Sequence, residues 1–166
     1  MAEQSSASET LWLLDGITDF RNYSEQLITQ SRRSIVILTH DLDALVYGTP
    51  QCVQQLSDFV RSSRDTQVQI LIKDTKPAIE TAHLLLRLAQ RLSSKILVRK
   101  MTLEPNNKEM GFMVGDTDKL LYKNDDALHR GFFNSAAASE IKSLREEFNY
   151  LWQYSELEPE FQLLQI

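Results

Sequence analysis

The sequence predicts an α/β domain in which helices flank a mixed, mostly parallel sheet. Three short apolar runs alternate with stretches in which apolar residues recur at helical spacing, which is the pattern of β-α-β units. After the third run, two further apolar runs lie close enough together to pair as a hairpin. We therefore expect antiparallel strands to extend a parallel core.

The parallel strands are predicted from three runs, "SIVILT" at 34–39, "VQILIK" at 68–73 and "KILVRK" at 95–100. The first run is nearly continuous in apolar, β-branched residues, as expected of a strand that is covered on both faces. Helical patterns lie before and between these strands, at 15–33, 50–63 and 75–92. The last pattern is uninterrupted, so we expect a single helix there. Its apolar face would carry Ile79, Ala82, Leu86 and Ala89.

The antiparallel part and the C-terminus follow from the remaining patterns. "GFMVGD" and "KLLYK" are predicted to form a hairpin across residues 116–118. A long closing helix is predicted from the apolar stripe Ile141, Leu144, Phe148, Leu151 and Trp152. The tail after it should fold back onto the domain, because it carries Phe161, Leu163, Leu164 and Ile166. Residues 1–10 are small and polar and are expected to fray, which leaves residues 11–166 as a single domain.

Charge and composition argue against several classes of partner. A formal net charge of −5 and a pI near 5.2 predict no nucleic-acid and no membrane partner, since both need a basic surface. Cys52 is the single cysteine, so no intramolecular disulfide or thiolate metal cage can form, which fits the cytoplasm. No apolar run is long enough for a membrane span. Glycine-rich nucleotide motifs and metal-like histidine spacing are absent from the sequence, so we expect no cofactor and no metal.

The order of the predicted elements resembles one half of the phospholipase D fold. "LLDGITDFRNYSEQLITQSRRSIVIL" is similar to the first helix and strand of that superfamily, and "FNSAAASEIKSLREEFNYLWQYS" is similar to its last helix. Other pieces, among them "LTHDLDALVYG", "AHLLLRLAQRL" and "GFMVGDTDKLLYK", resemble an uncharacterised bacterial domain family that occurs alone or behind GNAT-type N-acetyltransferase domains. The resemblance implies the fold and an acetyltransferase partner.

Catalysis of the phospholipase D type needs a His-x-Lys-x4-Asp motif, in which the histidine takes the phosphoryl group and the lysine neutralises its oxygens. Aligning the aspartate with Asp116 places Glu109 at the histidine position and Gly111 at the lysine position. A carboxylate repels a phosphodiester, and glycine supplies no positive charge. We therefore predict that the chain lacks this activity. Such enzymes combine two motifs, and this chain holds one degenerate half, so a twofold homodimer is a further expectation.

Polar side chains follow the predicted strands at the edge where open α/β sheets place their ligands. They are His40, Asp41 and Asp43 after the first strand, Asp74 after the second, and His83 and Arg87 in the third predicted helix. The two helical residues are four apart and would share one face. These six residues form a predicted site for a small polar or anionic ligand.

Two interpretations of this cluster are open. In the functional interpretation, Arg87 and His83 donate to a ligand, while Asp41 or Asp74 orients them. In the structural interpretation, the aspartates cap the helices that follow the strands, and His83 hydrogen-bonds to Asp74 or Asp41. His129 lies in a predicted loop and is not assigned to the site.

Three hypotheses of function follow. The leading hypothesis is a non-catalytic domain that binds a ligand or a protein, working with an acetyltransferase. The alternative is a hydrolase with a rebuilt site of His40, Asp41, Asp74 and His83. The third hypothesis is a purely structural homodimer.

Overall fold

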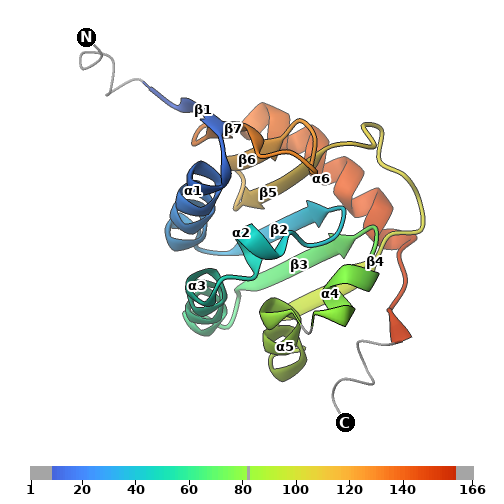
Figure 1. Cartoon of the computed structure of the whole chain (residues 1–166). Helices are drawn as coiled ribbons and strands as arrows, with labels where there is room; N and C mark the ends of the chain where they lie inside the picture. The colour runs from blue at the N-terminus through green and yellow to red at the C-terminus, as the bar shows by residue number, and fades with distance from the viewer. Residues whose placement is uncertain (1–8, 82, 160–166) are drawn as a thin grey trace.

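A seven-stranded sheet forms the middle layer of the computed structural model, which describes residues 9–81 and 83–159 (Figure 1). The strands follow one another across the sheet in the order β1 (Leu11–Asp15), β7 (Arg130–Asn134), β6 (Lys119–Lys123), β5 (Gly111–Gly115), β2 (Ser34–Thr39), β3 (Gln67–Ile72) and β4 (Ile96–Lys100). Strands β2, β3 and β4 run parallel, as predicted. The predicted hairpin of β5 and β6 is also present, and β5 pairs antiparallel with β2.

The mixed sheet is confirmed, but its pairings are not mostly parallel as expected. Four of the six neighbouring strand pairs are antiparallel. The difference comes from β1 and β7, which pair with each other at one side of the sheet. Neither sequence shows the alternation of apolar and polar residues that predicts a strand. β1 has the sequence LWLLD, and β7 has only two phenylalanines between polar residues.

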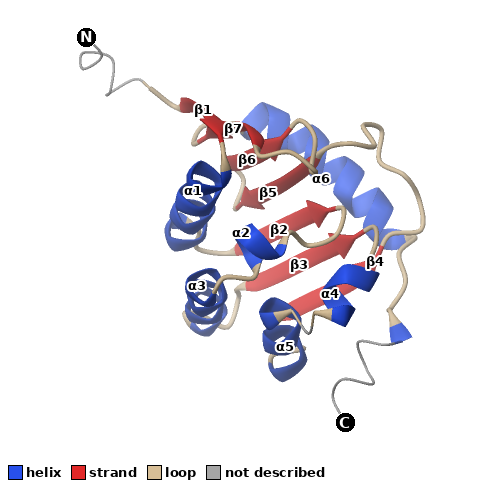
Figure 2. Ribbon diagram, viewed as in Figure 1, coloured by secondary structure: helices blue, strands red, loops and turns tan. Residues whose placement is uncertain are grey.

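Helices cover both faces of the sheet (Figure 2). One face carries α1 (Ile17–Gln30), α3 (Pro50–Arg61) and α5 (Leu84–Arg91), with the short helices α2 (Ala44–Tyr47) and α4 (Lys76–Glu80), and the other face carries α6 (Ala138–Gln153). No helix in the described ranges is long and apolar enough to cross a membrane. Residues of β2 alternate between two cores, with Ile35 and Ile37 in the first and Val36 and Leu38 in the second, beside α6. Burial on both faces explains the continuous apolar run of this strand.

The third predicted helix is two helices. The chain leaves helical geometry between α4 and α5, where the ring of His83 accepts a hydrogen bond from the amide of Leu85 at 3.1 Å and so caps α5. The predicted apolar face is therefore interrupted, and its member Ala82 lies outside the described residues. Because His83 precedes α5 with extended backbone, it does not share a helical face with Arg87.

The segment after α6 returns to the sheet as far as it is described. Glu156 and Lys100 exchange backbone hydrogen bonds of 2.8 and 3.0 Å in an antiparallel bridge. Glu158 is buried and accepts a hydrogen bond from the Thr75 hydroxyl at 2.9 Å. The residues on which the predicted fold-back depends lie outside the described part of the chain: Phe161, Leu163, Leu164 and Ile166.

Candidate functional site

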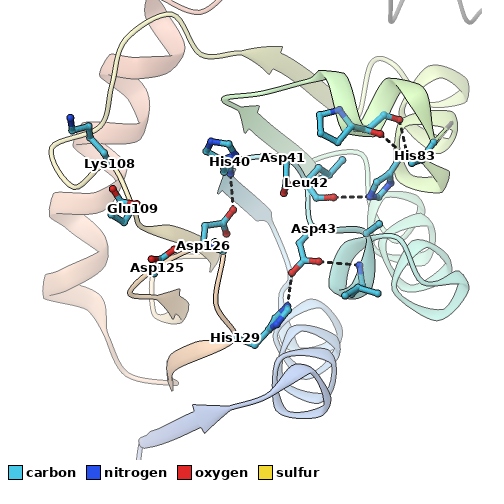
Figure 3. Close-up of a pocket in the computed structure, with 16 residues that line it drawn as sticks. His40, Asp41, Leu42, Asp43, His83, Lys108, Glu109, Asp125, Asp126 and His129 are labelled. Carbon is cyan, nitrogen blue, oxygen red and sulfur yellow. Dashed lines mark hydrogen bonds and ion pairs between the residues drawn. The ribbon is translucent and has the colours of Figure 1, made fainter.

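A pocket of about 490 Å³ lies at the edge of the sheet where β2 ends (Figure 3). Four segments that are distant in sequence contribute to its lining. They are residues 40–45 after β2, residues 77, 78, 81 and 83 around the end of α4, residues 108–109 before β5, and residues 125–127 and 129 before β7. They meet because the parallel strands end at the edge where β5 and β7 begin. The pocket thus occupies the position that α/β sheets favour for ligands.

A buried ion-pair network forms the floor beneath this pocket. Lys123, at the end of β6, has a side chain that is 3% exposed, and its Nζ lies 2.9 Å from Oδ2 of Asp43 and 3.6 Å from Oδ1 of Asp126. His129 places Nε2 2.7 Å from the same Oδ2 of Asp43. Burial acts to raise the pKa of Asp43, but Lys123 and His129 together hold that pKa below its ordinary value. Asp43 is therefore an ionised carboxylate whose Oδ2 is shared by Lys123 and His129, while its Oδ1 accepts a hydrogen bond from the Leu45 amide at 3.0 Å.

Asp126 fills the space above Gly111. Its Oδ2 accepts hydrogen bonds from the Thr39 hydroxyl at 3.1 Å and from the His40 amide at 2.8 Å. A Cβ atom built on Gly111 would lie only 2.1 Å from Oδ1 of Asp126. The carboxylate can occupy this position only because residue 111 has no side chain.

The three positions that were aligned with the His-x-Lys-x4-Asp motif lie at opposite ends of β5. Glu109 lines the pocket and Gly111 lies against the Asp126 carboxylate, whereas Asp116 lies in the β5–β6 turn at the far edge. Lys123 is the register partner of Gly111 on the adjacent strand. A cation is thus present one strand away from the motif's lysine position, but two carboxylates already neutralise it.

The structure brings four of the six predicted site residues to the pocket and leaves two outside its lining. His40, Asp41, Asp43 and His83 line it. Asp74 lies on the same edge, since its amide donates to the His40 carbonyl at 2.6 Å, but its exposed carboxylate accepts from the Lys76 amide at 3.2 Å at the start of α4. Arg87 is exposed on α5.

His83 has a structural role in this arrangement. Its Nε2 lies 2.9 Å from the Leu42 carbonyl oxygen (Figure 3). Its Nδ1 accepts a hydrogen bond from the Leu85 amide, so Nε2 carries the proton. Burial lowers the pKa of His83, although the Leu42 carbonyl opposes this effect. A neutral ring with both nitrogens bonded cannot also donate to an anion. The predicted partners of His83, Asp41 and Asp74, are replaced by backbone groups.

Negative charge dominates the pocket. Five carboxylates line it, against the two lysines at its rim and floor, Lys108 and Lys123. The five are Asp41, Asp43, Glu109, Asp125 and Asp126. Burial and the nearby charge of Asp126 raise the pKa of Asp41, whose carboxylate has no hydrogen-bond partner among the described residues. Asp41 is thus the half-buried carboxylate that is available to a ligand.

Lys123 and Asp126, which hold the floor together, are absent from the predicted site. The position of Lys123 could be predicted from the hairpin. A turn at residues 116–118 sets Gly115 opposite Lys119, and this register places Lys123 opposite Gly111. No comparable signal exists for Asp126, since it lies in a loop whose path depends on the tertiary fold.

Solved structures define the class of fold as phospholipase D-like. NucT from Helicobacter pylori has 12% identity and a TM-score of 0.60, over 90% of this chain and 98% of its own. A phosphatidylserine synthase from Haemophilus influenzae Rd KW20 has 12% identity and a TM-score of 0.58, over 95% of this chain and 40% of its own. Within this class, the chain belongs to the family described as "Domain of unknown function (DUF7931)", whose model matches residues 17–164. A comparison with curated protein sequences gives no match.

The prediction that the chain has no nucleic-acid partner needs correction. TrmBL2, an archaeal chromatin protein with a described mode of DNA binding, has 13% identity and a TM-score of 0.67 over 95% of this chain. The chain spans 57% of the length of that protein. A fold of this kind therefore occurs in a DNA-binding protein, so a negative net charge does not exclude nucleic acid as a partner.

Proposed function

We propose that the chain is a non-catalytic binding domain of the phospholipase D-like fold, and that its strand-end pocket holds the ammonium or guanidinium group of a ligand. One observation carries this proposal: the carboxylate of Asp126 fills the space above Gly111, at the position where the enzymes' motif has its lysine. Lys123 adds no available charge, because Asp43 and Asp126 neutralise it. A phosphodiester would find no uncompensated cation on the floor.

The electrostatics of the pocket favour a cation. At a separation of about 5 Å and an effective dielectric constant near 20, each carboxylate attracts a unit positive charge by roughly 3 kcal/mol and repels an anion equally. Asp41 and Glu109 line the pocket, and their side-chain carboxylates have no hydrogen-bond partner among the described residues. The resemblance to domains that follow N-acetyltransferases also supports an amine as the ligand, because such enzymes take amines as substrates.

The test is a thermal-shift screen of amines against anions on wild type and Asp41→Asn. A ligand that binds the native state raises its melting temperature, and we expect spermidine or agmatine to do so while inorganic phosphate has no effect through this pocket. Asp41→Asn should weaken amine binding about tenfold, the effect of losing one charged hydrogen bond. Asp74→Asn is the matched control, since it changes a carboxylate on the same edge but outside the lining. If the amine raised the melting temperatures of wild type, Asp41→Asn and Asp74→Asn equally, the proposal would be refuted.

A hydrolase is the second candidate function, and the pair of Asp43 and His129 favours it. The carboxylate orients a histidine that is 20% exposed beside the pocket, as a general base requires. Of the residues predicted for a rebuilt site, His40 and Asp41 remain at the pocket, whereas His83 has both ring nitrogens engaged. Hydrolysis of p-nitrophenyl acetate by wild type that disappears in a folded His129→Gln chain would establish this function.

A further inference from the structure

A second hollow lies at the opposite edge of the sheet, where β2 begins and the β5–β6 turn lies. Cationic side chains outnumber acidic ones in its lining, which contains Arg32, Arg33, Lys119 and Arg145 together with Asp116 and Asp118. The hollow is therefore positive within a chain whose formal net charge is −5. None of these residues belongs to the strand-end pocket.

Both aspartates of this hollow already have partners. The carboxylate of Asp116 accepts hydrogen bonds from the backbone amides of Arg32, Arg33 and Ser34 at 2.8–3.2 Å. Burial acts to raise the pKa of Asp116, but these amides together hold that pKa below its ordinary value. Asp118 pairs with Lys119 at 3.1 Å. The arginine side chains thus receive no carboxylate contact from either residue.

Arg145 is held in place by uncharged acceptors. Its Nη2 donates to the Ser34 hydroxyl at 2.7 Å and to the Asp116 carbonyl at 2.5 Å. In the described part of the chain, no carboxylate lies within ion-pair distance of this half-buried guanidinium. Arg32 and Arg33 are exposed, and their side chains make no hydrogen bond or ion pair with described residues. A partly desolvated cation without a counter-charge is costly, and a bound anion removes that cost.

We propose that this hollow binds a phosphate group. Guanidinium groups match the geometry of phosphate oxygens with two parallel hydrogen bonds, which a single ammonium cannot do. Arg145 is fixed by Ser34 and the turn, and Arg32 and Arg33 lie beside it at the start of β2. The phosphate belongs either to a small molecule or to the backbone of a nucleic acid, which present the same chemistry.

The experiment compares wild type with the double variant Arg32→Gln and Arg33→Gln. This variant retains the backbone amides that hold Asp116, so the turn stays formed. Arg87→Gln with Arg91→Gln is the matched control, because it removes two exposed arginines from α5, away from the hollow. Inorganic phosphate is titrated by calorimetry, and a labelled short DNA duplex is titrated by fluorescence anisotropy at two salt concentrations.

Wild type should bind inorganic phosphate or the duplex, and the variant at residues 32 and 33 should bind at least about tenfold more weakly. The control should stay within about twofold of wild type. Tighter binding of the duplex, with a salt dependence that falls in the variant, identifies a nucleic-acid backbone; binding of phosphate alone identifies a small molecule. The proposal is overturned if neither ligand binds, or if both double variants lose affinity equally.

Discussion

Replacing Lys123 by methionine removes the only cation from the floor of the strand-end pocket, as far as the described residues show, and leaves Asp43 and Asp126 facing each other. The lysine side chain is 3% exposed, so water cannot take over its role. Removing one partner of a buried ion pair costs about 3–5 kcal/mol. Methionine retains the apolar stem, which keeps the cavity contribution small. For a chain of this size the loss corresponds to a fall of roughly 10 °C in Tm.

Urea unfolding followed by circular dichroism at neutral pH measures this loss in the free energy of unfolding. Lys76→Met is the control, because its pair with Glu80 is exposed and spans 4.0 Å, and such pairs contribute less than about 1 kcal/mol. The difference between the two variants should shrink as the pH falls below about 4, because the pKa of Asp43 in the native chain is lowered and the ion pair contributes less as this carboxylate takes up a proton. If Lys123→Met is as stable as Lys76→Met, the ion pairs do not hold the floor and the reasoning fails.

Two further predictions concern the same region. Gly111→Ala should cost about 1–3 kcal/mol by overpacking, since its Cβ would clash with Asp126; a variant with unchanged Tm would contradict the packing described above. The second concerns pH: burial lowers the pKa of native His83, so the unfolded chain binds the proton first and stability falls as pH drops below about 6.5. His83→Asn, which can still cap α5, should lose less stability between about pH 7 and pH 5 in urea unfolding. Equal losses in both chains would show that another group is responsible.

The fold is predictable from the sequence where burial imposes a regular period. Strand β2, helix α3 and helix α6 are buried along continuous faces, and their residues repeat accordingly. The break between α4 and α5 has no such signal, because the apolar residues continue through it. It depends on a tertiary contact, the bond between the ring of His83 and the Leu42 carbonyl, which no local pattern records.

The site is predictable only in part for a related reason. His40, Asp41 and Asp43 follow directly from the rule that polar residues at strand ends meet at one edge. Lys123 requires the register of the hairpin as well, because its burial comes from the cross-strand position opposite Gly111. The place of Asp126 is set by a long-range hydrogen bond to the His40 amide, so its role becomes visible only in three dimensions.

The close approach of Asp126 to Gly111 has an evolutionary consequence. A lysine introduced at residue 111 would collide with the Asp126 carboxylate, whose oxygen lies 2.1 Å from the position of the new Cβ. Removing Asp126 first would leave the amide of His40 and the hydroxyl of Thr39 without their acceptor. Each intermediate step is therefore less stable than the present chain, and selection removes a chain whose stability falls below the level that its function needs. The packing of Asp126 against Gly111 therefore disfavours a lysine at residue 111 of this chain.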